Sequence, residues 1–334
     1  MMKLPNPLLK IIRIHLFSLM IAGCFLHSKP ISENSEQERE QDYVSQSIKT
    51  KFRGFKTNLN KRSIDLNLIL DGGPGKDGIP AINNPRFVSI SEIKIKDDVL
   101  GILVDIKGMK RYYPYNILVW HEIVSDSFNG MDIIVTFCPL CGSAIVFNAQ
   151  LEGEKLQFGV SGKLYESNLL MYDKKTESLW SQSRGEAVVG DYAGKKLDLV
   201  QMQLMRFSEL RAKYPETRIL SEKTGYSRDY SLYPYGDYES TERFYFPVSV
   251  QDTRFQAKEI MYVFKLHDKF VAFPAGKLDK KRVKKIIEGK IVAVERQGGE
   301  INVYLDGKVL PGYYEMWFSW ATHHQKNGIV WEIE

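Results

Sequence analysis

The feature that most constrains the fold is a series of short segments rich in β-branched and aromatic residues, most of them ended by Gly, Asn or Asp. Segments of this kind are typical of β-strands joined by tight turns. The segments predicted as strands are VLGILVDI (99–106), DIIVTF (132–137), SAIVFNA (143–149), IMYVFKL (260–266), KIVAVER (290–296) and INVYLDG (301–307). Helical patterns are fewer and cover 115–127, 205–214, about 277–287 and 314–324. The sequence therefore predicts an α+β fold of mostly short mixed or antiparallel strands with a few helices.

Two parts of the chain also resemble each other. The segment LGILVDIKGMKRYYPYNIL (100–118) aligns without gaps on IMYVFKLHDKFVAFPAGKL (260–278), and FSELRAKYP (207–215) aligns on WFSWATHHQ (317–325). Matches in the same order predict an internal duplication of a strand-turn-strand-helix unit. Coincidence between two strand-turn-strand segments is the alternative.

The first 23 residues have the pattern of a secretory signal, with a basic start, a short apolar run and small residues before Cys24. The apolar run is too short and too interrupted for a membrane-spanning helix. The residues IAGC also resemble the bacterial lipoprotein box, so we expect Cys24 to be lipidated and acyl chains to hold the protein at a membrane. An ordinary signal peptide with an incidental cysteine is the alternative. The sequence thus predicts an exported lipoprotein of the bacterial cell envelope, on the periplasmic or the surface side.

The rest of the chain is divided by composition. The polar, mostly acidic run after Cys24 predicts a tether, so residues 24–70 are assigned to the lipid anchor and tether. The Gly- and Pro-rich stretch DGGPGKDGIP opens the folded part, which we divide into a CxxC-containing domain, 71–250, and a half without cysteines, 251–334. Without residues 1–23 the charge is close to neutral, which gives no case for a nucleic-acid partner. No protein or small-molecule partner is identified.

Cys138 and Cys141 lie in TFCPLCGSAIVF, and three interpretations of them stay open. The first is a metal knuckle, in which two thiolates fold round one ion, although a single CxxC is a weak signal. The second is a redox-active pair, but the residues after Cys141 have a strand pattern, so the helix that commonly lowers the pKa of such a thiol is missing. The third is an inert disulfide in an oxidising envelope, where so small a loop gives little entropic stabilisation.

The leading hypothesis is a copper or zinc centre formed by Cys138, Cys141 and His121. The helical spacing around His121 places it on an apolar, buried face, and it places Glu122 in solvent. A buried histidine with a backbone partner is the alternative. Met171 is the candidate fourth ligand, because thioether sulfur favours Cu(I) whereas a second histidine or a carboxylate suits zinc. Core packing is the alternative for Met171.

Other polar residues are candidates for a ligand pocket. Arg228 and Asp229 lie in the irregular loop TGYSRDYSLYPYGDY, where they either bind a ligand or form an internal ion pair. Ser161, Asp173 and Gln182 are candidates for the same pocket. The chain has no phosphate-binding loop, no GxSxG elbow and no paired-histidine zinc motif, so whether it is an enzyme stays open.

Several blocks together are similar to a known family. The blocks are DGIPAINNPRFVSISE, YPYNILVWHEIVSD, TFCPLCGSAIVF, FGVSGKLYESNLLMYDKKTESLWSQ, GEAVVGDYAG and TGYSRDYSLYPYGDY. Over about residues 71–280 they resemble the prokaryotic domain-of-unknown-function family 3179, for which no activity is established. The resemblance implies that the family's signature blocks contain His121, Cys138, Cys141, Ser161, Met171, Asp173, Trp180, Gln182, Arg228 and Asp229. The chain departs from the family at Phe207 and Tyr214, where members tend to have Trp and His.

These observations leave three hypotheses for function. The protein is an envelope lipoprotein that binds copper or zinc through its Cys-x-x-Cys/His centre, a thiol–disulfide oxidoreductase, or a binding or scaffold lipoprotein with a structural disulfide. Metal content separates the first from the others, and exchange with glutathione separates the second from the third.

Overall fold

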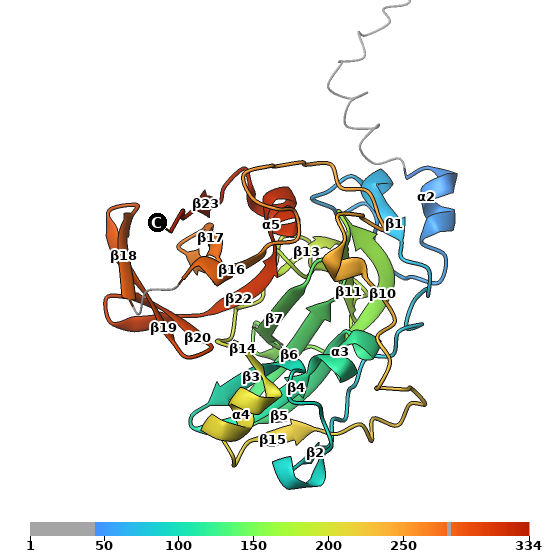
Figure 1. Cartoon of the computed structure of the whole chain (residues 1–334). Helices are drawn as coiled ribbons and strands as arrows, with labels where there is room; N and C mark the ends of the chain where they lie inside the picture. Colours follow the sequence, from blue (N-terminus) through green and yellow to red (C-terminus); the bar gives the residue numbers. More distant parts are fainter. Residues whose placement is uncertain (1–43, 279–281, 334) are drawn as a thin grey trace, which may run out of the picture. The chain divides into compact units, whose positions relative to one another are not determined.

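Strands carry most of the fold in the computed structural model, which describes residues 44–278 and 282–333 (Figure 1). The expected signal and the lipidation site at Cys24 lie outside the described residues. The described α-helices are short: α2 (Gln46–Lys51), α3 (Tyr115–His121), α4 (Phe207–Lys213) and α5 (Trp317–His324). The prediction of an α+β fold is therefore wrong, because the described residues form a mostly β structure with five sheets and few helices.

A seven-stranded sheet is the largest of the five, with the order β23-β17-β16-β22-β7-β6-β5. Its pairs are antiparallel except for β17 with β23. The strands are β5 (Ile123–Phe128), β6 (Met131–Cys138), β7 (Ser143–Asn148), β16 (Ile260–Leu266), β17 (Lys269–Pro274), β22 (Gly312–Met316) and β23 (Ile329–Val330). Segments on both sides of the expected boundary at residue 250 thus contribute to one sheet.

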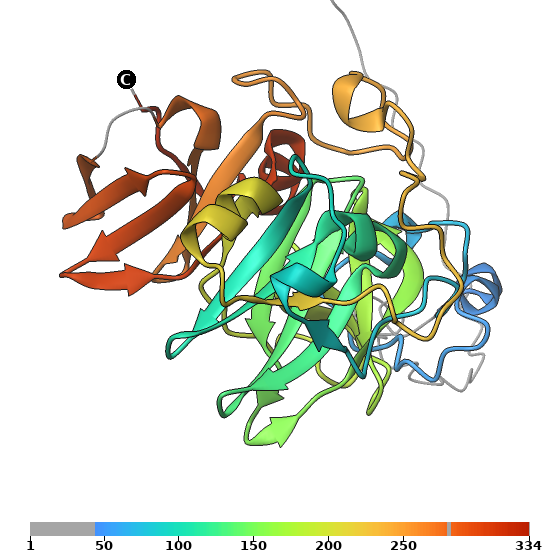
Figure 2. The same ribbon diagram turned by 60° about the horizontal axis from the view of Figure 1, so that its bottom comes forward.

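Two further sheets have five strands each, and their strands alternate along the chain with those of the seven-stranded sheet, as the sequence colours of Figure 2 allow the reader to follow. The first, in the order β1-β10-β11-β12-β13, is antiparallel throughout and contains β1 (Ile69–Asp71), β10 (Phe158–Tyr165), β11 (Asn168–Asp173), β12 (Leu179–Ser181) and β13 (Glu186–Val189). The second, in the order β14-β3-β4-β15-β2, has one parallel pair, β15 with β4. Its strands are β2 (Phe87–Val88), β3 (Leu100–Ile106), β4 (Met109–Pro114), β14 (Gln203–Arg206) and β15 (Arg218–Leu220).

The two remaining sheets are antiparallel hairpin structures. They contain β18 (Arg282–Ile287), β19 (Lys290–Gln297), β20 (Glu300–Leu305) and β21 (Lys308–Leu310) in one, and β8 (Gln150–Leu151) and β9 (Glu154–Lys155) in the other. Residues 282–287 were expected to be helical. They instead form β18, which pairs with β19 along its whole length and in which Val283, Ile286 and Ile287 are the β-branched residues that favour a strand.

The expected strand-turn-strand-helix duplication is also not supported. In the first segment α3 follows β4, whereas β17 is followed only by a single 3-10 turn, Ala275–Lys277. The helix expected over 115–127 ends at His121, and the chain then continues as β5. The apolar residues that predicted one long helix therefore belong to a short helix and to the strand that follows it. Periodicity alone does not show where the helix ends and the strand begins.

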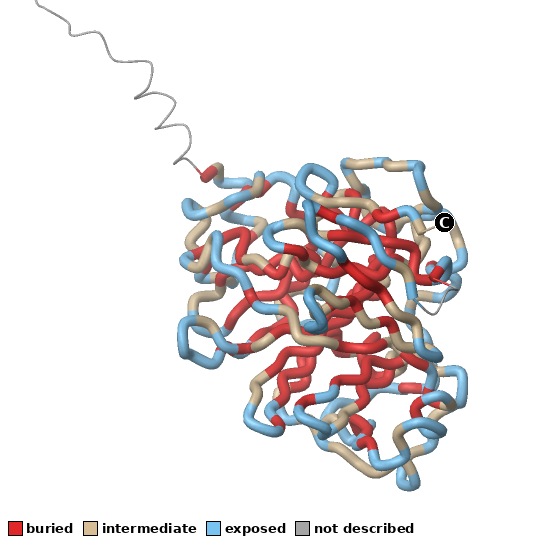
Figure 3. The backbone as a smooth tube through the Cα atoms, turned by 90° about the vertical axis from the view of Figure 1, so that its left-hand side faces the viewer, coloured by how far each residue is buried: buried red, intermediate tan, exposed pale blue. Residues whose placement is uncertain are grey.

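Buried residues concentrate along the strands of the larger sheets. In Figure 3 they run through the interior of the described part, with exposed residues around its edge. One apolar cluster joins α3, β5 and β16 to the β19–β20 hairpin, and a second cluster contains the cysteines together with Trp180, Trp317 and Trp320. Burial of each large apolar side chain contributes about 1.5–3 kcal/mol, so these clusters supply the main driving force for folding. The helix α2 and strand β1 belong to a third cluster, which includes residues that were assigned to the tether.

Candidate functional site

Cys138 and Cys141 lie at the tip of the β6–β7 hairpin. Cys138 is the last residue of β6 and pairs with Ser143, the first of β7. The Cys141 N–H donates to the Cys138 carbonyl at 3.3 Å, and Gly142 closes the turn in the left-handed region, with φ +55°. A strand follows the second cysteine, as the sequence predicts. The turn brings the two Sγ atoms to 2.7 Å, and both are free thiols with at most 2% of the residue exposed.

The surroundings of Cys138 oppose charge on its thiol. Burial raises the pKa of Cys138 well above its usual range, and contact with the Cys141 thiol raises it further. Hydrogen bonds from the backbone N–H groups of Cys141 and Leu169 lower this pKa, but by less. Burial likewise raises the pKa of Tyr235 and of Tyr238, and the nearby thiols add to both effects. The pair therefore favours states without charge, namely two neutral thiols or a disulfide.

Glu122 is a buried acidic residue that interacts electrostatically with Cys138. The helix α3 ends at His121, and Glu122 adopts a left-handed conformation, φ +58°, while its N–H donates to the Leu118 carbonyl at 2.7 Å. Its own carbonyl accepts from Phe137 N–H at 2.8 Å, which fixes it beside the end of β6. Burial raises the pKa of Glu122 well above its usual range, and charge on Cys138 raises it further.

The expectation that Glu122 lies in solvent is therefore wrong, since only 7% of the residue is exposed. The helical wheel that predicted exposure does not apply to a residue that ends the helix and turns into a strand. A carboxyl group with a raised pKa beside a thiol is a common feature of sites that move protons.

A buried amide network orients the sulfur of Cys141. Asn168 Nδ2 lies 3.1 Å from Cys141 Sγ, 3.3 Å from Ser143 Oγ and 3.2 Å from Gln182 Oε1. The Asn168 Oδ1 atom accepts from the Ser183 N–H at 3.1 Å. Gln182 Nε2 in turn donates to the Ser143 carbonyl at 3.1 Å. The network thus holds Asn168 Nδ2 against Cys141 Sγ and fixes the position of that sulfur.

Both ring nitrogens of His121 are engaged in hydrogen bonds. Nδ1 lies 2.7 Å from the Pro80 carbonyl and Nε2 lies 2.8 Å from the Tyr230 hydroxyl. Because a carbonyl only accepts, Nδ1 carries the proton and Nε2 accepts from Tyr230. Burial lowers the pKa of His121, so the ring is neutral at pH 7. His121 is buried, as predicted, but Nε2 can bind a metal only after Tyr230 has moved away.

No group of three or more His, Cys, Asp or Glu side chains is placed to hold a metal ion within residues 44–278 and 282–333. Met171 lies in β11 between Val160 and Trp180, and it belongs to the same apolar cluster as the two cysteines. Met171 is fully buried there, as expected for a residue that packs in the core. Its thioether sulfur also belongs to the cluster that contains the two thiols.

The other candidate pocket residues serve different parts of the structure. The Ser161 hydroxyl bonds the Leu170 carbonyl and accepts from Lys163 N–H within the irregular part of β10. Asp173 orders the β11–β12 connection by accepting from Thr176 N–H at 2.7 Å and from Trp180 Nε1 at 3.0 Å. Gln182 alone among these candidates belongs to the network around Cys141.

Arg228 and Asp229 are exposed and line a cavity that also includes Tyr230. Arg228 bonds the Ser227 carbonyl and Asp229 accepts from Ser231, so among the described contacts the two do not pair with each other. Their loop reaches the site from outside, since the Tyr238 hydroxyl donates to the Leu140 carbonyl at 2.8 Å.

Sequence reasoning missed four residues of the site: Glu122, Asn168, Tyr235 and Tyr238. Asn168 lies in the block ESNLLMYD and Glu122 directly follows His121, so both stood inside the segments that carried the family resemblance. The tyrosines come from an irregular loop, for which periodicity gives no signal.

Comparisons with known proteins add one finding. A family model described as "Protein of unknown function (DUF3179)" matches residues 76–308. No curated protein and no solved structure matches the chain. Among the described residues, no helix has the length and apolar character needed to cross a membrane.

Proposed function

The chain belongs to the DUF3179 family of proteins of unknown function, and we propose that Cys138 and Cys141 form a dithiol–disulfide centre that exchanges two electrons. The observation that carries this proposal is the 2.7 Å separation of the two Sγ atoms. A disulfide bond is about 2.05 Å long, so closing it requires a movement of only about 0.7 Å. Both redox forms are uncharged, which suits a buried site whose nearest titratable neighbours are acidic or phenolic.

The proposed step is thiol–disulfide exchange. One cysteine sulfur attacks a substrate disulfide, which forms a mixed disulfide and releases one substrate thiol. The second cysteine sulfur then attacks the first, which closes the Cys138–Cys141 bond and releases the second substrate thiol. The protein loses two electrons and two protons, and both go to the substrate sulfur atoms.

Glu122 and Asn168 have defined tasks in this step. The raised pKa of Glu122 beside Cys138 suits it to take the thiol proton during attack and to return it to the leaving sulfur. The Nδ2 donor of Asn168 stabilises charge on Cys141 Sγ as the bond changes. Because Cys138 is buried, the cycle also requires the loop that carries Tyr235 and Tyr238 to open.

The test uses single-cysteine variants in a Cys24→Ser background. Cys141→Ser and Cys138→Ser are incubated with oxidised glutathione, and adducts are identified by mass spectrometry. At least one single variant forms a stable glutathione adduct, and the double variant serves as the control without an adduct. The proposal is wrong if neither variant forms an adduct and the unmodified pair stays reduced under the same conditions.

A thiophilic metal held by the two sulfurs is the second candidate. It is favoured by the hairpin-tip turn with its left-handed Gly142, and by the N–H groups of Cys141 and Leu169 directed at the Cys138 sulfur. Copper or zinc would use Cys138 and Cys141, with Met171 or His121 as further ligands. Metal analysis after anaerobic purification distinguishes this candidate, which predicts stoichiometric metal that is lost in Cys138→Ser. Equal, sub-stoichiometric metal in both proteins contradicts it.

Export and lipidation at Cys24 belong to the same proposal, because a stable disulfide needs an oxidising compartment. They are supported by the signal-like pattern of residues 1–23 and by the IAGC box. Expression of the full chain in a bacterium with labelled palmitate tests this part. Label and membrane association that are both lost in Cys24→Ser support it, and a protein that stays unlabelled contradicts it.

A further inference from the structure

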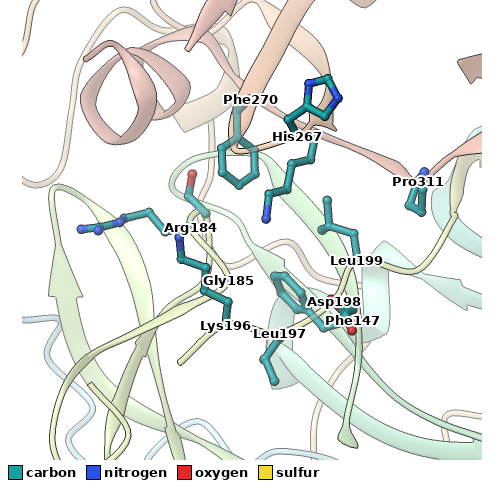
Figure 4. Close-up of a pocket in the computed structure, with 12 residues that line it drawn as sticks. Phe147, Arg184, Gly185, Lys196, Leu197, Asp198, Leu199, His267, Phe270 and Pro311 are labelled. Atoms are coloured by element: carbon teal, nitrogen blue, oxygen red, sulfur yellow. The ribbon is translucent and has the colours of Figure 1, made fainter. Parts of the chain in front are cut away.

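A cavity of about 250 Å³ lies between the connection that follows β12 and the β16–β17 hairpin (Figure 4). Phe270 and Phe147 face it from opposite sides, and Leu197 extends the apolar wall near Phe147. Gly185 contributes a stretch of backbone with φ +58°, where a Cβ atom would lie 2.8 Å from a ring carbon of Phe147. Glycine at position 185 therefore leaves room for the Phe147 ring in the wall of the cavity.

The size of the cavity sets the size of its ligand. An engineered cavity of about 150 Å³ holds a benzene molecule, so about 250 Å³ accommodates a compound of roughly ten heavy atoms. The aromatic and aliphatic walls require that most of this compound be apolar.

The charges around the cavity do not balance. Arg184 and Lys196 share one carboxylate, Glu186, at 3.2 and 3.8 Å, and Figure 4 shows Arg184 directed away from the cavity. Lys265 also lines the cavity, and no ion pair in the described part of the chain includes it. The lining residues thus include three cationic side chains, whereas two carboxylates balance them, Asp198 in the lining and Glu186 outside it. The excess of one positive charge suits a ligand with one negative charge.

Ser183 connects this cavity to the cysteine site. Its N–H donates to Asn168 Oδ1 at 3.1 Å, and Asn168 Nδ2 lies 3.1 Å from Cys141 Sγ. The Ser183 hydroxyl is already engaged with the buried Glu315 carboxylate at 2.9 Å, so it does not serve as the ligand's partner. Recognition of the anionic group falls to the lysines.

We propose that the cavity binds a small monoanion with an apolar body, such as an aryl-substituted or short-chain carboxylate, with Lys265 as the partner of the carboxylate group. The apolar body lies between Phe147 and Phe270. This assignment does not depend on the redox chemistry of the cysteines, so the two proposals can fail separately.

Isothermal titration with a set of matched compounds tests the proposal. The compounds are 3-phenylpropionate, its neutral amide, and inorganic phosphate as an anion without an apolar body. We expect the carboxylate to bind at least about tenfold more tightly than the amide, because charge-assisted hydrogen bonds are roughly twice as strong as neutral ones. Phosphate alone should not bind measurably.

A lysine variant then locates the site. Lys265→Met keeps the aliphatic stem and should weaken carboxylate binding about tenfold while leaving the amide unaffected. Lys290→Met, on β19 and outside the cavity lining, is the matched control and should leave both affinities unchanged. Equal affinity for carboxylate and amide, no effect of Lys265→Met in a protein with an unchanged melting temperature, or no binding at millimolar carboxylate would each overturn the proposal.

Discussion

Replacement of Asn168 by alanine tests the network that holds the sulfur of Cys141. The side chain is buried and connects Cys141 Sγ, Gln182 Oε1 and the Ser183 N–H. Gln182 Oε1 keeps a second donor, since Ser143 Oγ lies 2.6 Å from it. The Ser183 N–H, in contrast, loses its acceptor in a site that excludes water.

The expected cost follows from these contacts. An unpaired buried N–H costs about 1–3 kcal/mol, and each lost hydrogen bond with a satisfied partner costs about 0.5–1.5 kcal/mol. We therefore expect Asn168→Ala to lower the free energy of unfolding by about 2–4 kcal/mol. Asn168→Asp, which keeps the shape but replaces the Nδ2 donor with an acceptor, should be at least as destabilising at pH 7.

Urea unfolding followed by tryptophan fluorescence measures this effect, because Trp180, Trp317 and Trp320 are buried. Asn58→Ala is the matched control, since Asn58 is bonded to Asp191 at the surface, at 3.0 Å, and its loss should change stability by no more than about 0.5 kcal/mol. If Asn168→Ala is as mild as this control, the amide network does not hold the site together.

Three further predictions concern neighbouring residues. Glu122→Gln should slow the reaction of the cysteines with oxidised glutathione by about 10²-fold at pH 7 without loss of stability, and an unchanged rate would remove Glu122 from the proton transfer. Burial raises the pKa of Glu315 from 4.5 to about 7, so between these values the folded state binds more protons and stability falls as the pH rises. Between pH 4.5 and 7 the free energy of unfolding should therefore fall by about 3 kcal/mol less in Glu315→Gln than in the unmodified protein. The same dependence of this free energy on pH in both proteins, measured by urea unfolding, would contradict this. Gly142→Ala places a Cβ atom 3.0 Å from Met316 Cγ at φ +55° and should lower the free energy of unfolding by about 1–3 kcal/mol. Gly130→Ala, also left-handed but in open space, should cost less, and equal costs would show that contact with Met316 is unimportant.

The sequence predicted individual strands better than their assembly. The segments 99–106, 132–137 and 143–149 correspond to β3, β6 and β7, because β-branched residues and bounding turns are local signals. The union of β7 with β22 in one sheet joins residues about 170 positions apart, Ala144 and Tyr314, and no local pattern specifies that pairing.

The site was predicted in part for the same reason. The cysteine turn and the burial of His121 follow from local sequence, whereas the burial of Glu122 depends on where α3 stops. A boundary error of a few residues is enough to turn a side chain from solvent to interior. The tyrosines of the covering loop come into contact with the hairpin only through tertiary structure.

An equilibrium redox titration of the Cys24→Ser protein tests the central claim most directly. The fraction of protein with a Cys138–Cys141 disulfide is measured by alkylation and mass spectrometry across a series of glutathione buffers. The account predicts one reversible two-electron transition, with a midpoint between about −270 and −120 mV. A pair that remains as two thiols in the most oxidising buffer, or a disulfide that no buffer reduces in the folded protein, would contradict it.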